Sequence, residues 1–186
     1  MPVKPWKQIG SPEKATPFFF SKGLILQRFV NPLTHKLEDF YLYALRNSVV
    51  VLAVTTDHQV IVTREFMQGA NEIVEWIGGG LANDGETLEQ AARRELLEET
   101  GYTARRFRKL LDVFPTPGFV SERMLVYAVD RLIPGDAGPD ADERIQAKYF
   151  SLRQLEILIR RGKLRDAKSI AGILYYARFG RKPVRR

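Results

Sequence analysis

Residues 80–102 read GLANDGETLEQAARRELLEETGY, and this stretch decides the fold of the chain. Within it, apolar residues recur near the spacing of one helix face, at Leu88, Ala91, Ala92 and Leu96. Gly101 follows, where the end of a helix favours a residue that tolerates positive φ. We therefore predict a helix over residues 86–100, ended by Gly101.

The same stretch carries a cluster of carboxylates. Glu95, Glu98 and Glu99 stand at i, i+3 and i+4, so their side chains project from one face of the predicted helix. Like charges at that spacing destabilise a helix by roughly a few tenths of a kcal/mol per pair, unless a cation lies among them. The cluster is therefore either an acidic face in solvent or a site for a hard divalent cation, which bridges carboxylates to substrate phosphates.

The surrounding residues restrict the kind of metal site. The chain has no cysteine and only two histidines, so a bound metal must be held mainly by oxygen. Arg94 can pair with a neighbouring carboxylate and orient it. Three consecutive glycines, Gly78, Gly79 and Gly80, allow the backbone to approach a ligand closely.

Outside this stretch, the sequence predicts strands interleaved with two later helices. β-Branched and aromatic runs predict strands at residues 18–20, 24–30, 40–45, 48–56, 59–64, 107–114, 123–130 and 144–150. Ser151 caps a predicted helix over residues 152–161, and a final helix is expected over residues 167–178. Residues 1–17 contain four prolines and predict irregular structure. We expect an α/β or α+β sandwich built on a mixed sheet.

Charge and hydropathy exclude some classes of protein. The net charge is 29 − 22 = +7, but residues 178–186 hold five positive charges and no negative one, which leaves 7 − 5 = +2 for the rest. A solvated basic tail is therefore favoured over a polyanion-binding arm, and a nucleic-acid partner is not expected. The longest apolar run, residues 49–54, is far shorter than the roughly 20 residues of a membrane-spanning helix. Because no signal-peptide core follows Lys4 and Lys7, we expect a cytoplasmic protein.

The stretch at residues 80–102 resembles the Nudix box, a glycine, glutamate and arginine pattern of defined spacing. The fixed positions are filled by Gly80, Glu86, Arg94, Glu95, Leu96, Glu98, Glu99 and Gly101, with Tyr102 as a mild departure. The resemblance implies an α/β/α sandwich and hydrolysis of a nucleoside diphosphate linked to another group. It implies that Glu95, Glu98 and Glu99 bind Mg²⁺ or Mn²⁺, with Glu86 in support and the Gly79 carbonyl as a possible further ligand. Glu98, Glu99 and Arg94 are accordingly candidate catalytic residues.

The flanking residues are similar to those of one Nudix subgroup, the ADP-ribose pyrophosphatases and nucleoside diphosphate sugar hydrolases. Residues 114–122, FPTPGFVSE, look like the proline-containing loop of that subgroup, which makes Pro117, Phe119 and Glu122 candidates for substrate binding. Residues 140–145, DADERI, look like its acidic loop, so Glu143 is the candidate general base.

Two departures from the subgroup concern substrate selectivity. Ahead of the box, EWIGGG at residues 75–80 lacks a usual proline and shifts the acid by one position. An arginine usual near Met67 is also missing. Trp76 is a candidate for stacking on a base, Arg64 for contacting a phosphate, and Gly78 and Gly80 for close approach to the substrate.

The leading functional hypothesis is metal-dependent hydrolysis of the pyrophosphate bond of ADP-ribose or a related nucleoside diphosphate sugar. The alternatives are a hydrolase of dinucleoside polyphosphates or RNA caps, and a non-catalytic module that senses a nucleotide sugar. We expect residues 1–39 to form a β-strand extension that mediates a homodimer, residues 40–178 to form the hydrolase domain, and residues 179–186 to form a basic tail.

Overall fold

The computed structural model describes residues 21–135 and 145–180. Its centre is a four-stranded sheet in the order β6 (Gly79–Leu81), β3 (Ser48–Ala53), β9 (Met124–Val129), β8 (Arg108–Val113). β3 and β9 pair in parallel, whereas the β3–β6 and β8–β9 pairs are antiparallel. Every residue of β3 and β9 is buried, as expected for strands covered on both faces. The predicted mixed sheet is confirmed.

A second sheet is antiparallel throughout and has the order β11 (Gln146–Ser151), β4 (Gln59–Met67), β5 (Glu72–Trp76). β7 (Tyr102–Thr103) and β10 (Ile133–Pro134) form a small additional pair. The helices are α1 (Leu88–Thr100), α2 (Leu152–Arg160) and α3 (Ala167–Tyr175), and a π-helical turn, η1 (Tyr176–Gly180), follows α3.

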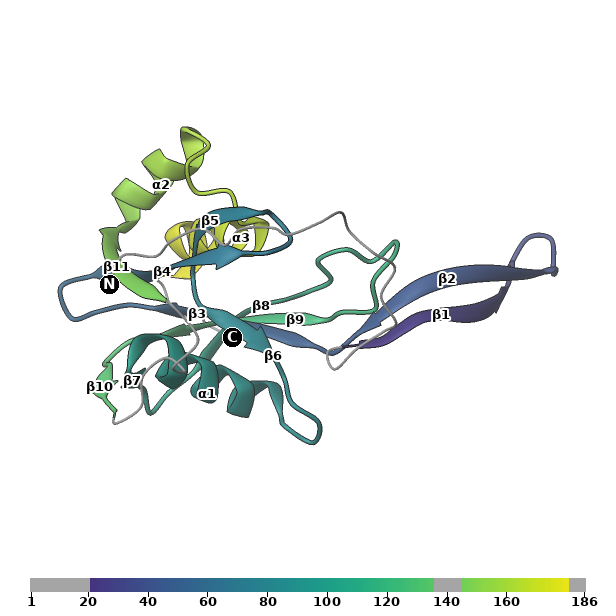
Figure 1. Ribbon diagram of the computed structural model, residues 1–186, viewed down its shortest axis with the longest axis horizontal. Coiled ribbons are helices and arrows are strands. Elements are labelled where there is room, and N and C mark those ends of the chain that lie inside the picture. Colours follow the sequence, from purple (N-terminus) through teal and green to yellow (C-terminus); the bar gives the residue numbers. More distant parts are fainter. Residues whose placement is uncertain (1–20, 136–144, 181–186) are drawn as a thin grey trace.

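Alternating residues of β3 pack into two separate apolar clusters on opposite faces of the central sheet. Val49 and Val51 join the cluster that contains Ala92 and Leu96 of α1. Val50 and Leu52 join the other cluster, to which α2 and α3 contribute Leu152, Leu155 and Ile173. Because successive side chains of a strand point to opposite faces, helices cover both faces of the sheet (Figure 1). The predicted α/β/α sandwich is confirmed.

A two-stranded ribbon extends away from this sandwich (Figure 1). β1 (Ser21–Val30) and β2 (Leu37–Leu45) pair antiparallel, with Val30 opposite Leu37 at the distal end. The strands predicted at residues 24–30 and 40–45 are confirmed, and β2 crosses the expected domain boundary between residues 39 and 40. The strand predicted at residues 18–20 and the irregular segment at 1–17 lie outside the described residues.

Three local expectations differ from the structure. Four strands were not expected, β5, β6, β7 and β10: EIVEW of β5 does not alternate strictly, and β6, β7 and β10 are only two or three residues long. The first helix begins at Leu88 rather than Glu86, since Thr87 and Gln90 form a capping box at its start. The last α-helix ends at Tyr175, and the chain continues to Gly180 as η1. Among the described residues, no helix is long and apolar enough to cross a membrane.

Candidate active site

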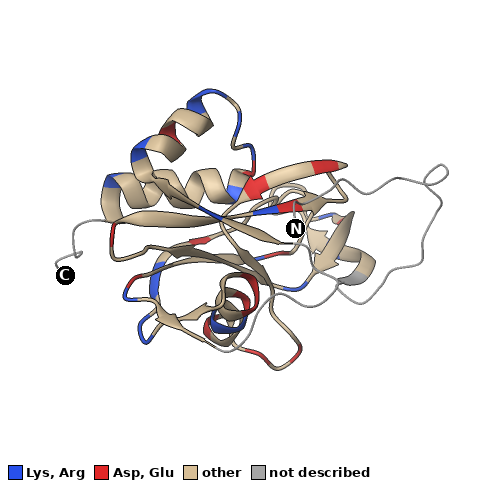
Figure 2. Ribbon diagram, turned by 60° about the vertical axis from the view of Figure 1, so that its left-hand side comes forward, with Lys and Arg blue, Asp and Glu red and all other residues tan. Residues whose placement is uncertain are grey.

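Helix α1 and strand β6 position the carboxylate cluster. Ala91, Ala92 and Leu96 anchor the buried face of α1 in the core, and Gly101 ends the helix at φ 71°. Acidic and basic positions lie close together on this helix, in the lower half of Figure 2. Because the apolar face of α1 is anchored in the core, Glu95 and Glu99 point toward residues 78–80. The carboxylate of Glu99 lies close to Gly78, and that of Glu95 lies close to Gly80.

Arg94 is the centre of an ion-pair network on α1. Its Nη1 donates to Glu95 Oε1 at 2.7 Å and to Glu98 Oε2 at 2.9 Å. Its Nε donates to Glu86 Oε1 at 3.1 Å, and its Nη2 donates to Glu86 Oε2 at 3.2 Å and to the Leu81 carbonyl at 3.0 Å. The repulsion expected within the cluster is therefore offset by one guanidinium that contacts three carboxylates.

The network shifts the pKa values of its members in opposite directions. The hydrogen bonds from Arg94 lower the pKa of Glu86 below its ordinary value of 4.5. Partial burial disfavours the charged form of Arg94, but its hydrogen bonds with Glu86, Glu95 and Glu98 outweigh burial and raise its pKa. Both groups are therefore charged near neutral pH.

Glu99 is the buried member of the cluster, with 7% of its surface exposed. Its Oε2 accepts a hydrogen bond from the Gly79 backbone N–H at 3.0 Å. A Cβ atom on Gly78 would overlap Glu99 Oε2, and one on Gly80 would overlap Glu95 Oε1. The run of glycines thus leaves room for two carboxylates against the backbone of β6 and the residue before it.

A cavity of about 500 Å³ lies beside this cluster. It is lined from α1 by Arg94, Glu95, Glu98 and Glu99, from β6 by Gly79 and Gly80, and elsewhere by Glu65, Met67, Trp76, Asn83 and Ile145. The sequence had not indicated Glu65, Asn83 or Ile145. For Glu65, alternation along β4 was a usable signal, because Glu65 and Met67 lie two residues apart and line the same cavity.

The residues of this cavity fit a hard divalent cation in donor chemistry. Four carboxylates line one space, those of Glu65, Glu95, Glu98 and Glu99, and Glu98 is the most accessible of the three on α1, with 39% of its side chain exposed. Within the described residues no three acidic, histidine or cysteine side chains already surround one point as ligands, because Arg94 holds Glu95 and Glu98 and Gly79 holds Glu99. Each of the hydrogen bonds from Arg94 uses one oxygen of the carboxylate, so Arg94 and a cation can bind Glu95 and Glu98 together.

Trp76 and Gly80 also line the cavity, and Gly78 lies directly behind Glu99. Trp76 is only 7% exposed, and its indole Nε1 is buried without a hydrogen-bond partner among the described residues. Such orphaned donors are rare in folded proteins. Because this nitrogen has almost no accessible surface, it does not face the cavity that Trp76 lines.

The other sequence candidates lie elsewhere or outside the described residues. Arg64 is on β4 but is not among the described residues that line the cavity. Pro117, Phe119 and Glu122 lie in the loop between β8 and β9, and none of them lines it. Glu143 falls outside the described residues, whereas Ile145, two positions later, lines the cavity.

The loop between β8 and β9 attaches the ribbon to the sandwich. The Phe119 carbonyl accepts a hydrogen bond from the Tyr43 N–H at 2.8 Å, and the Ser121 N–H donates to the Tyr43 carbonyl at 3.1 Å. Glu122 accepts a hydrogen bond from Ser48 Oγ at the start of β3. In this structure the loop contacts β2 and β3.

A mixed-sheet sandwich in which one helix holds an arginine-centred group of glutamates against a glycine-rich strand is the arrangement that the resemblance of residues 80–102 to the Nudix box implied. The model of the NUDIX domain matches residues 44–173, and the chain belongs to this family. It is a Nudix hydrolase, as the resemblance of residues 80–102 implied, and Nudix hydrolases generally require a divalent metal ion.

The proteins similar to this chain include the following two curated relatives and one solved structure. An ADP-ribose pyrophosphatase of Bacillus subtilis (strain 168) is 32% identical over 130 residues, covering 69% of this chain and 70% of the relative. A GDP-mannose pyrophosphatase of Citrobacter koseri is 28% identical over 154 residues, covering 77% of this chain and 78% of the relative. A solved structure described as an ADP compounds hydrolase matches with a TM-score of 0.68, covering 90% of this chain and 97% of its own. At 18% identity, that structure supports the fold alone.

Proposed function

We propose that this Nudix hydrolase cleaves the pyrophosphate bond of ADP-ribose or a related nucleoside diphosphate sugar, giving a nucleoside monophosphate and a sugar phosphate. The observation that carries the proposal is the cavity in which Glu95, Glu98 and Glu99 lie together beside β6. The relatives that act on ADP-ribose and GDP-mannose support the class of substrate.

In this proposal Glu95, Glu98 and Glu99 hold Mg²⁺ or Mn²⁺, with the Gly79 carbonyl as a further oxygen ligand. A bound divalent cation supplies neutralisation of the diphosphate charge and a water of lowered pKa. Arg94 positions Glu95 and Glu98 through hydrogen bonds of 2.7 and 2.9 Å, and Glu86 fixes Arg94 from the other side.

Glu143 is the proposed general base. Its position two residues before Ile145, which lines the cavity, supports this role, because two residues of extended chain span only about 7 Å. A base must come within hydrogen-bond reach of the attacking water, so the residues just before Ile145 are suitably placed in the chain.

A panel of substrates tests the proposal. AMP should form from ADP-ribose in the presence of Mg²⁺ or Mn²⁺, and its formation should stop with EDTA. Cleavage of a dinucleoside polyphosphate or capped RNA, with no cleavage of ADP-ribose, ADP-glucose or GDP-mannose, would instead support the first alternative. Saturable binding of the sugars without turnover of any substrate would support a sensing module.

Replacing Trp76 with Phe is expected to raise KM for the sugar substrate about tenfold, with a smaller change in kcat. Trp76 lines the cavity, and we propose that its indole ring stacks on the base of the substrate, a contact worth about 1–3 kcal/mol that the smaller ring of phenylalanine weakens. Steady-state kinetics measure the effect. Phe119→Leu is the matched control, since Phe119 is half exposed and does not line the cavity. An unchanged KM in Trp76→Phe would contradict the role.

We also propose that the ribbon of β1 and β2 mediates a homodimer. Residues directly opposite in an antiparallel pair share a face, and one face of the ribbon carries five exposed apolar side chains. These are Leu24, Leu26, Val30, Leu37 and Tyr41, which are 47–69% exposed. An isolated two-stranded ribbon is marginally stable in water, and a second copy would cover this face.

The double substitution Leu26→Glu with Tyr41→Glu is expected to convert the dimer into a monomer of 21.3 kDa. Both residues are exposed and opposite each other, so charge there opposes association without disturbing the sandwich. Size-exclusion chromatography with light scattering measures the mass. Leu174→Glu on α3, 42% exposed, is the control and should remain dimeric. A wild-type protein of 21.3 kDa would refute the dimer.

A further inference from the structure

A second and larger cavity lies at the far end of the central sheet. Its volume is about 950 Å³, and Val54, just after β3, and Val129 and Asp130, at the end of β9, line it. Strand β6, which lines the candidate active site, pairs with the opposite end of β3, at Val49 and Val50. Val54 lies four residues after Val50 along the chain, a distance of about 13 Å in a strand, so this cavity is distinct from the candidate active site.

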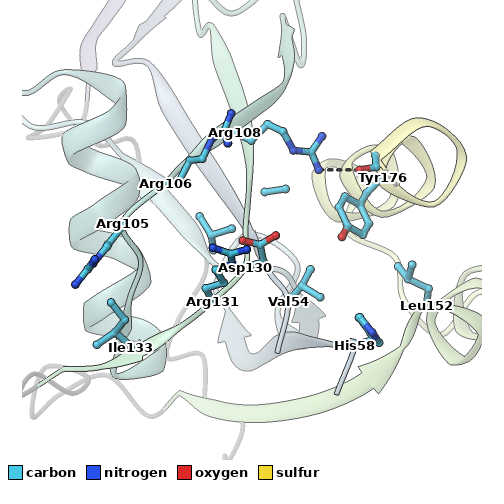
Figure 3. Close-up of a pocket in the computed structure, with 13 residues that line it drawn as sticks. Val54, His58, Arg105, Arg106, Arg108, Asp130, Arg131, Ile133, Leu152 and Tyr176 are labelled. Carbon is cyan, nitrogen blue, oxygen red and sulfur yellow. Dashed lines mark hydrogen bonds between the residues drawn. The ribbon is translucent and has the colours of Figure 1, made fainter. Parts of the chain in front are cut away.

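Among the described residues, four arginines and one carboxylate line this cavity. Arg105, Arg106 and Arg108 come from the segment that leads into β8, and Arg131 follows Asp130 (Figure 3). Elsewhere in the described chain, arginines such as Arg28, Arg93, Arg94, Arg123 and Arg165 pair with carboxylates. Within the described residues, the guanidinium groups of Arg105, Arg106 and Arg131 make no hydrogen bond or ion pair. Among the residues that the structure describes, the guanidinium groups that line this cavity therefore outnumber its carboxylate by four to one.

The fourth arginine is fixed in place by the C-terminal helical turn. Arg108 Nη2 donates to the Gly180 carbonyl at 2.9 Å, and its guanidinium carbon lies 5.8 Å from the centre of the Tyr176 ring (Figure 3). Arg131 has a φ of 53°, a left-handed conformation that side chains other than glycine adopt at a cost. Arg108 is thus held by a defined contact, whereas Arg105, Arg106 and Arg131 are exposed.

Apolar groups form much of the remaining wall. Val54, Ala128, Val129, Ile133 and Leu152 line the cavity together with the ring of Tyr176. Ligand sites commonly combine such apolar walls with a few convergent polar groups. Guanidinium groups are suited to phosphate, because their planar donors can contact two oxygens at once.

We propose that this cavity binds a small ligand that carries at least two phosphate groups, such as a nucleoside di- or triphosphate. The arginines neutralise its phosphates, and the apolar wall accommodates a nucleoside. This site is separate from the candidate active site, and the proposal does not depend on which substrate the hydrolase cleaves.

The test is binding of ATP measured by isothermal titration calorimetry in EDTA, which removes the divalent metal that the candidate active site requires. The triple variant R105Q/R106Q/R131Q should bind ATP at least tenfold more weakly than the wild type, while hydrolysis of the sugar substrate is unchanged. The control, R160Q/R161Q/K163Q, removes the same charge from exposed positions at the far end of α2 and should change ATP affinity less than twofold. Circular dichroism and thermal unfolding verify that both variants fold.

Tripolyphosphate and a twelve-nucleotide single-stranded RNA serve as further probes. Binding of both ATP and tripolyphosphate, or of ATP alone, that depends on the three arginines supports the proposal. It is overturned if the wild type binds neither ATP nor tripolyphosphate at millimolar concentration, or if the triple variant and the wild type bind equally. It is also overturned if the control loses as much affinity as the triple variant, or if only RNA binds.

Discussion

Replacing Glu98 with Gln is expected to lower kcat about a thousandfold or more, a loss of about 4 kcal/mol of transition-state stabilisation. The substitution keeps the shape of the side chain but removes the charge that a divalent cation requires. Glu98 is the most exposed carboxylate of the cluster in the cavity, and one of its oxygens accepts a hydrogen bond from Arg94 at 2.9 Å. Steady-state turnover of ADP-ribose at saturating Mg²⁺ measures the effect.

A control on the same helix separates catalysis from folding. Glu89→Gln removes an exposed carboxylate that pairs with Arg93 and does not line the cavity, so turnover should change less than twofold. Thermal unfolding with and without Mg²⁺ gives a second readout. Mg²⁺ should raise the Tm of wild type and Glu89→Gln, but much less that of Glu98→Gln, because ligand binding stabilises the state that binds it. Normal turnover by Glu98→Gln would refute the assignment of this site.

The helix and its carboxylates were predictable because their signals are local. The spacing of Ala91, Ala92 and Leu96 defines a buried face, and that face in turn determines where Glu95 and Glu99 point. The central strands β3 and β9 were also predictable from the sequence, since β-branched runs predict buried strands. The placement of the cluster against β6 then followed from packing of α1 on β3.

Features that depend on contacts between distant segments were not predictable from sequence. The burial of Glu99 depends on an N–H donated by Gly79, twenty residues earlier. The extent of the Arg94 network depends on Glu86 and on the Leu81 carbonyl, which only the fold brings together. The second cavity likewise joins Arg108 to Gly180, 72 residues apart, and no motif marks such a pairing.

Replacing Gly79 with Ala is expected to destabilise the protein by about 3 kcal/mol or more. Gly79 has a φ of 153°, which L side chains rarely adopt, and an added Cβ would overlap the Val49 carbonyl oxygen and lie 2.8 Å from Val50 Cα. Both neighbours are backbone atoms of the central strand β3, so neither can move aside cheaply. Urea unfolding followed by circular dichroism measures the change in the free energy of unfolding.

Substitutions at two further glycines distinguish the cost of the backbone conformation from the cost of the steric overlap with β3. Gly85 has a φ of 81° but open space around a Cβ, so Gly85→Ala should cost only about 1 kcal/mol, for the backbone conformation alone. Gly69 has open space and no positive φ, so Gly69→Ala should change stability by less than about 0.5 kcal/mol. A cost at Gly79 no larger than at Gly85 would contradict the close packing of β6 on β3. Since Gly79 also donates its N–H to Glu99, that packing determines both the stability of the sheet and the position of the buried carboxylate.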